Sequence, residues 1–140
     1  MPLELASLRN SVKSLTDLLA VSEHDARMGQ LSEVERNGIR SGVIQNFEVT
    51  YELSWKLMAR WLNTYIGAGI ADGVTKRQLF RLAAENRLIL DVDLWVQHHE
   101  ARNATSHIYD EEKALLVYRA TREFAHDARL LLEALEARND

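Results

Sequence analysis

The sequence predicts an all-α protein, an up-and-down antiparallel bundle of about five helices, three of them long. Chain breakers are rare, since the 140 residues include six glycines and one proline, at position 2. Apolar residues recur at steps of three and four, and no stretch has the period-two alternation of a strand. Because the composition is that of an ordinary globular protein, with 46% hydrophobic and 27% charged residues, we expect one domain over residues 1–140.

The first expected helix covers residues 3–22 and is amphipathic. Its apolar positions are Leu5, Leu8, Val12, Leu15, Leu18 and Leu19. The polar stretch 22–30 is predicted to be a loop. Residues 32–35 (Ser-Glu-Val-Glu) fit a capping box that would begin the next helix, whereas Asn37-Gly38 is a turn signal that would move its start to near Ser41.

The longest uninterrupted helical pattern runs from about residue 42 to 66. One stripe consists of Val43, Phe47, Ser54, Met58, Trp61 and Tyr65, and a second includes Leu53 and Leu57. A helix that is apolar on two sides is expected at the centre of its bundle. The glycine-rich segment 67–73 ends it. This segment lacks the spacing and the lysine of a phosphate-binding loop, so we interpret it as a connector.

Three capping residues predict the remaining helices. Residues 75–78 (Thr-Lys-Arg-Gln) form a capping box for a helix to about Arg87, and Asp91 or Asp93 caps a helix that runs to about residue 102 or 103. Asp110 caps the last helix. The core stripe of that helix is Val117, Thr121, Phe124, Ala128, Leu131 and Leu135.

Composition limits the function classes. The absence of cysteine excludes disulfides and thiolate metal sites and fits the cytoplasm, and no apolar run is long enough for a membrane span. The formal charge of −4 argues against a broad basic face for nucleic acid. Segment 75–89, however, has four basic residues against one acidic residue, a local net charge of +3. It predicts either an electropositive surface near Arg102 or an ordinary solvated helix face.

Residues 102–109 (Arg-Asn-Ala-Thr-Ser-His-Ile-Tyr) concentrate the polar chemistry of the chain. An arginine fork suits phosphate, and a histidine can exchange a proton near neutral pH. Together they suffice for metal-independent cleavage of RNA by its own 2′-hydroxyl, with His107 as general base or acid and Arg102 stabilising the phosphate charge. The alternative is that a turn before a helix collects such residues only for capping.

Arg102 and His107 are five residues apart, or about 140° around a continuous helix. Either the helix stops near Asn103, or the site combines residues of two chains. A two-fold dimer would place two sets in one cleft, so we expect a homodimer whose cleft is lined by residues 98–109. Tyr109 could support the site, stack on an RNA base, be modified by another enzyme, or pack against the end of the bundle.

A second polar group lies in the long helix. Glu48, Glu52 and Lys56 share one face, with Tyr51 and Trp55 beside them. We interpret this stripe as solvated or partner-facing, with a catalytic role as the alternative.

The segment His98-His99-Glu100 invites a metal interpretation. Adjacent residues of a helix point about 100° apart, however, and the chain has no His-x3-His pair. We therefore expect no metal and no cofactor.

The two polar segments together resemble a known family. Residues 44–56 (Ile-Gln-Asn-Phe-Glu-Val-Thr-Tyr-Glu-Leu-Ser-Trp-Lys) resemble the signature helix of the nucleotidyltransferase substrate-binding protein family, and residues 102–110 match its second motif. This family belongs to the HEPN superfamily and is similar to HepT-type toxins, whose motif is R-x4-H-x-Y. The resemblance extends from about residue 3 to residue 138.

The resemblance implies a dimerising helical bundle and a partner that is a minimal nucleotidyltransferase, as in HEPN/MNT toxin–antitoxin pairs. In HepT-type members the motif arginine and histidine cleave RNA without metal, which implies Arg102 and His107 here, supported by Asn103. The antitoxin silences such toxins by adenylylating the motif tyrosine, here Tyr109. An older interpretation implies a non-catalytic subunit that binds substrate or nucleotide for the transferase. Its shared surface would consist of Glu48, Tyr51, Glu52, Trp55 and Lys56.

Overall fold

The computed structural model describes residues 2–108 and 110–140, and within these ranges it contains helices and no strand. The helices are α1 (Ala6–Glu23), α2 (Asp25–Gly29), α3 (Glu33–Tyr65), α4 (Lys76–Glu85), α5 (Val92–Ala104), the 3-10 turn η1 (Thr105–His107) and α6 (Glu111–Ala137). Three are long, with 18, 33 and 27 residues in α1, α3 and α6. The all-α prediction is therefore confirmed.

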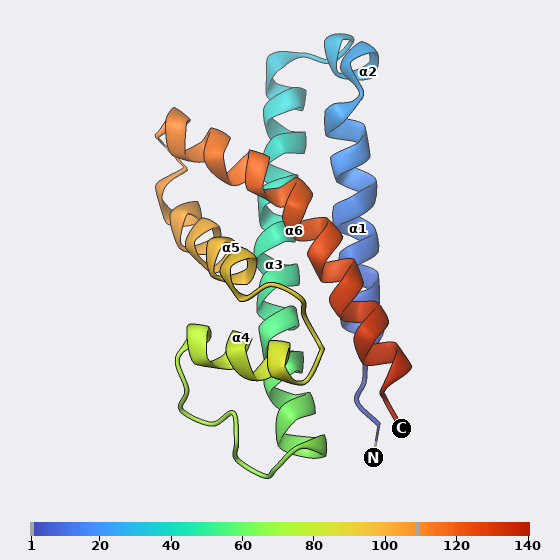
Figure 1. Ribbon diagram of the computed structural model, residues 1–140. Helices are drawn as coiled ribbons and strands as arrows, with labels where there is room; N and C mark the ends of the chain where they lie inside the picture. The colour runs from blue at the N-terminus through green and yellow to red at the C-terminus, as the bar shows by residue number, and fades with distance from the viewer. Residues whose placement is uncertain (1, 109) are drawn as a thin grey trace.

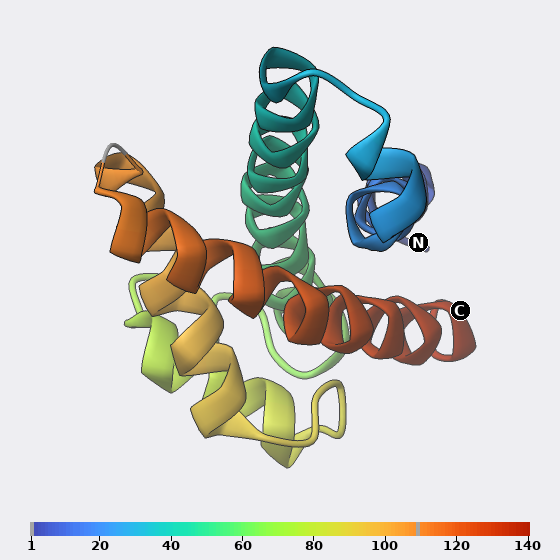
Figure 2. The same ribbon diagram turned by 90° about the horizontal axis from the view of Figure 1, so that it is seen from above.

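The long helices form an up-and-down bundle to which α4 is added crosswise (Figure 1). Helices α1 and α3 lie side by side and antiparallel, and α2 joins them at one end. The antiparallel pair α5 and α6 follows, and α6 crosses α3 obliquely to reach α1, as Figure 2 shows from above. Both chain ends meet at the far end, where Leu3 N donates to Asn139 Oδ1 (2.6 Å) and Asn139 Nδ2 donates to Leu3 O (2.9 Å).

One local prediction was wrong, and the structure decides between the two alternative starts of the long helix. Residues 22–30 are not a loop, because α1 continues to Glu23 and the chain then forms α2, which buries Met28. The polar character of this stretch reflects exposure of the short helix rather than the absence of one. The Asn37-Gly38 turn signal also fails, because α3 begins at Glu33 and runs through it. An exposed helical glycine costs only about 1 kcal/mol, and the Ser32 capping box with Glu35 is fully formed.

The predicted apolar stripes form the core. The stripe of α6 is buried throughout, as is that of α3 except for half-buried Tyr65. Phe124 lies where three helices meet, with its ring edge-on to Phe47 of α3 (4.9 Å between centroids) and to Trp95 and His98 of α5 (5.8 and 5.2 Å). This ring therefore fixes α3, α5 and α6 relative to one another.

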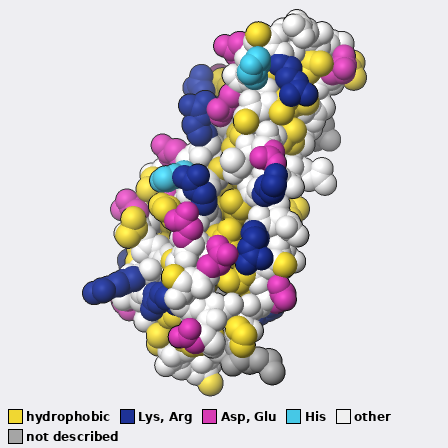
Figure 3. Space-filling view, turned by 90° about the vertical axis from the view of Figure 1, so that its right-hand side faces the viewer, with side chains coloured by type: hydrophobic (Ala, Val, Ile, Leu, Met, Phe, Trp, Pro, Cys, Tyr) yellow, Lys and Arg dark blue, Asp and Glu magenta, His cyan; other side chains and the backbone are white. Residues whose placement is uncertain are grey.

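The outer surface carries charges of both signs. On the face in Figure 3, acidic and basic side chains are interspersed along a band of apolar groups, and neither sign forms a broad patch there. This pattern agrees with the modest net charge of −4. Within the part of the chain that the structure describes, no helix is both long and apolar enough to cross a membrane.

Candidate functional site

The polar motif lies where α5 ends and the chain turns back into α6. Arg102 and Asn103 belong to the last turn of α5, and Thr105, Ser106 and His107 form η1. Hydroxyl groups terminate the helix, because Thr105 Oγ1 donates to the carbonyl of Arg102 (2.7 Å) and Ser106 Oγ donates to that of Asn103 (3.0 Å). The helix thus ends next to Asn103, which was one of the two alternatives. Tyr109 lies outside the described residues.

Arg102 brings the two predicted polar segments together. Its Nη1 donates to Thr105 Oγ1 (3.0 Å) and lies 3.8 Å from Glu48 Oε2, while its Nε lies 3.5 Å from Glu52 Oε1. The glutamates come from successive turns of α3. The Arg102 side chain is 30% exposed, and its buried Nε forms no hydrogen bond within the described residues. Of the five N–H donors of a guanidinium, the two on Nη2 therefore have no partner within the described residues and are the ones left for a ligand.

The cluster continues from Glu52 to the basic start of α4. Trp55 Nε1 donates to Glu52 Oε2 (3.1 Å), and Lys76 Nζ lies over the Trp55 ring at 3.7 Å from its centroid. Lys56 Nζ lies farther away, at 5.8 Å. Arg77 instead pairs with Asp93 (3.6 Å). The predicted basic approach to Arg102 therefore reaches this cluster through Lys76.

A second chain of contacts links the core to Asn103. The Tyr51 hydroxyl lies 2.7 Å from His99 Nδ1, and His99 Nε2 lies 3.4 Å from Asn103 Nδ2. Burial is the main factor that raises the pKa of Tyr51 above its usual value. Burial, followed by the charge of Lys76, lowers the pKa of His99. Both side chains are therefore neutral at pH 7.

This contact chain changes the interpretation of Tyr51 and of the histidine pair. The Tyr51 ring is 1% exposed, so it belongs to the core and not to the partner-facing stripe on which the sequence placed it. The sequence presents His99 as a candidate metal ligand and as part of the cleft segment 98–109, and its position three residues before Arg102 places it on the same helix face. The three-residue spacing between His99 and Arg102 is the sequence signal that indicates a role for His99 near the site.

His98 and His99 point in different directions, as helix geometry requires. His98 is 2% exposed and its Nε2 lies 2.6 Å from Asp127 Oδ2 of α6. Its role is to join α5 to α6 in the core. Within residues 2–108 and 110–140, no group of three His, Cys, Asp or Glu residues is placed to hold a metal ion.

His107 is exposed on η1. Its imidazole forms no hydrogen bond with any other described residue, and its backbone carbonyl accepts from Asp110 N (3.0 Å). Asp110 in turn caps α6 by accepting from the backbone N–H of Glu112 (3.0 Å). The imidazole is therefore open to a ligand, and a backbone hydrogen bond joins His107 to the N-cap residue of α6.

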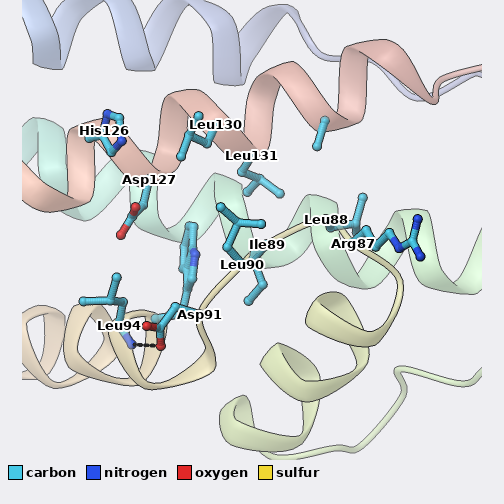
Figure 4. Close-up of a pocket in the computed structure, with 12 residues that line it drawn as sticks. Arg87, Leu88, Ile89, Leu90, Asp91, Leu94, His126, Asp127, Leu130 and Leu131 are labelled. Atoms are coloured by element: carbon cyan, nitrogen blue, oxygen red, sulfur yellow. Dashed lines mark hydrogen bonds between the residues drawn. The ribbon is translucent and has the colours of Figure 1, made fainter.

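The cavity in Figure 4 lies apart from this cluster. It has a volume of about 400 Å³, opens to solvent and is lined by the connection between α4 and α5, the start of α5, and α6. Leucine and isoleucine side chains dominate its wall, and Asp127 and His126 lie at one side. The α5 residues that line it lie at the beginning of that helix, whereas Arg102 and Asn103 lie at its end.

The buried phenol of Tyr51 predicts a loss of stability at alkaline pH. In the unfolded chain this group ionises near pH 10, whereas in the fold it keeps its proton because its pKa is raised. Its contribution is complete below about pH 10 and falls by up to about 1.4 kcal/mol per pH unit above it. Urea unfolding from pH 9 to 11 measures this, and Tyr51→Phe should flatten the profile. An equally steep profile in the variant would contradict this assignment.

Comparisons with known proteins agree on one family. The family model described as "Nucleotidyltransferase substrate binding protein like" matches residues 3–137. A protein of Haemophilus influenzae named "Probable ribonuclease HepT" is 40% identical over 100 residues, which are 71% of this chain and 68% of that protein.

Two solved structures share the fold. One, from Haemophilus influenzae, is described as the fold of a substrate binding domain of a nucleotidyltransferase. It has a TM-score of 0.90 and 31% identity, over 95% of this chain and 99% of that one. The other, from Thermus thermophilus, has a TM-score of 0.64 and 27% identity, over 91% and 97% of the two chains.

Proposed function

This chain belongs to the family of nucleotidyltransferase substrate-binding proteins, and we propose that it is a HepT-like, metal-independent endoribonuclease. In this proposal it works as a homodimer and is the toxin of a HEPN/MNT pair. The observation that carries the proposal is the cluster at the end of α5. There an arginine is oriented by two glutamates and a threonine, and it stands five residues before an exposed histidine. The relative named as a ribonuclease supports the same function.

The proposed reaction uses the 2′-hydroxyl of RNA as nucleophile. Its oxygen attacks the adjacent phosphorus while an imidazole accepts its proton, and the bond to the 5′-oxygen breaks as that oxygen receives a proton. The products are a 2′,3′-cyclic phosphate and a 5′-hydroxyl. His107 performs one of the two proton transfers, and Arg102 stabilises the charge on the non-bridging oxygens. A two-fold dimer would supply a second His107 for the other transfer.

The direct test is cleavage of a labelled structured RNA and a tRNA pool by purified protein in EDTA. We expect cleavage at the same rate with and without EDTA, with cyclic-phosphate ends. Loss of activity in EDTA would contradict the proposed mechanism. Intact mass and gel filtration should accompany the assay, because the proposal makes Tyr109 the site at which a nucleotidyltransferase silences the chain and requires a dimer.

A second candidate function is a non-catalytic subunit that binds substrate or nucleotide for a nucleotidyltransferase. The half-buried group formed by Glu52, Trp55 and Lys76 favours it, because an indole beside a lysine suits a nucleotide. A nucleotide at a hundredfold excess over its dissociation constant would stabilise the fold by about 2.7 kcal/mol. A thermal shift that disappears in Trp55→Ala, with no RNA cleavage by the unmodified dimer, would favour this function over the nuclease.

If the substrate is RNA, Lys76 should contribute one phosphate contact. Glu48 and Glu52 offset the charge of Arg102, so a polyanion needs a further cation, and Lys76 forms no ion pair with a described carboxylate. We expect Lys76→Gln to weaken RNA binding and to reduce the slope of log K against log salt by about 0.7, the value for one single-strand contact. Arg77→Gln is the matched control, because Arg77 pairs with Asp93. Equal slopes in wild type and Lys76→Gln would contradict the prediction.

A further inference from the structure

We infer that Tyr51 and His99 fix the side-chain amide of Asn103 so that its NH2 group faces the substrate, which makes Asn103 a hydrogen-bond donor to the phosphate and His99 a positioning residue. The inference rests on the proposed nuclease function for its catalytic consequence. Its structural part, the tautomer of His99, is independent of activity. The inference depends on two successive contacts, from Tyr51 in the core to His99 and from His99 to Asn103 at the surface. In each contact, the choice of donor determines which atom donates in the next.

Burial of Tyr51 determines which atom donates in its hydrogen bond with His99. Tyr51 is 1% exposed, and within the described residues the partner of its hydroxyl is His99 Nδ1, at 2.7 Å. A buried hydroxyl hydrogen without an acceptor costs about 1–3 kcal/mol. The raised pKa of Tyr51 keeps the phenol protonated. The phenol therefore donates, and Nδ1 of His99 accepts.

This direction sets the tautomer of His99. A neutral imidazole has one donor and one acceptor nitrogen, and the lowered pKa of His99 keeps the ring neutral at pH 7. Because Nδ1 accepts, the proton is on Nε2. The Nε2–H then points toward the Asn103 amide, so this amide has to present an acceptor to it.

The acceptor requirement orients Asn103. The amide atom nearest to His99 Nε2, at 3.4 Å, is Nδ2, and two donors cannot share a hydrogen bond. A half turn of the amide exchanges Nδ2 and Oδ1 and satisfies both side chains. The NH2 group then points away from His99. Since Asn103 is exposed and follows Arg102 directly, its two N–H donors add to those of the guanidinium at a phosphate.

The tautomer is tested by long-range proton–nitrogen NMR of the imidazoles in the RNA-free protein at pH 8. We expect His99 in the Nε2–H form, with the nitrogen shift of an accepting Nδ1. Tyr51→Phe should abolish this preference and give a mixture of tautomers. A wild-type His99 in the Nδ1–H form would overturn the inference, whether or not the protein cleaves RNA.

The catalytic part is tested by a double-mutant cycle. His99→Ala should lower kcat by roughly ten- to a hundredfold with little change in KM, and His99→Gln, whose amide can also donate, should restore part of the loss. In an Asn103→Ala background the additional effect of His99→Ala should disappear. His126→Ala is the control, since His126 is exposed on α6. Losses that multiply in the double variant would overturn the inference. A wild type that cleaves no RNA would contradict the proposed function and leave the NMR test valid.

Discussion

Replacement of His107 by alanine is expected to slow RNA cleavage by about 10²–10⁴-fold, the usual contribution of a general acid or base. The fold should not change, because His107 is exposed and its imidazole has no hydrogen-bond partner among the described residues. A surface substitution of this kind changes the free energy of unfolding by less than about 0.5 kcal/mol. Rates with a labelled RNA in EDTA and melting curves measure the two quantities.

His126→Ala is the matched control, since it removes another exposed histidine, on α6. It should leave the cleavage rate unchanged. Arg102→Lys adds a second check, because lysine keeps the charge but loses the planar fork, and it should also be slow. If His107→Ala cleaved RNA at the wild-type rate, the assignment of the acid–base group would be wrong. If it melted several degrees lower, the motif would have a structural role.

Phe124→Ala is expected to have the largest effect on stability, a loss of about 3–5 kcal/mol in the free energy of unfolding. Its ring is completely buried and contacts aromatic rings of α3 and α5 from α6. Truncation removes these contacts and leaves a void between α3, α5 and α6, which these helices could fill only by moving toward one another. Urea unfolding followed by circular dichroism gives the free energy and also tests for two-state behaviour.

Leu116→Ala is the control for this experiment. Leu116 lies on the same helix but is 64% exposed, so its truncation should change the free energy of unfolding by less than about 0.5 kcal/mol. A loss below about 1.5 kcal/mol for Phe124→Ala would contradict the central place of its ring. An intermediate variant, Phe124→Leu, should lie between wild type and alanine because it fills part of the void.

The sequence predicted the helices well wherever a local signal determines them. Ser32, Thr75 and Asp110 cap helices as expected, since a side chain that accepts from backbone N–H groups two or three residues later acts within one turn. The failures at residues 22–30 and at Asn37-Gly38 have the opposite cause. There the weak local preference was overridden by the continuity of a helix and by the packing of α2.

The site was predicted in two separate parts. The helical period places Glu48 and Glu52 on one face of α3, but it does not say which helix lies opposite them. The crossing of α5 over α3 supplies Arg102 as their partner, and this is a tertiary property. The same reason explains why Tyr51 was placed at the surface and why its contact with His99 was not predicted, since their hydrogen bond joins residues 48 positions apart.

The pair of glutamates that holds Arg102 also predicts how this family diverges. A chain that lost only Glu48 or only Glu52 would keep one carboxylate to orient the guanidinium, so either change alone should be tolerated. A chain that lost Arg102 would retain two like charges one turn apart, which disfavours a helix by a few tenths of a kcal/mol. If the proposed nuclease function is right, relatives without that activity should therefore change at all three positions together. In an alignment, correlated loss of this triad would separate binding subunits from nucleases.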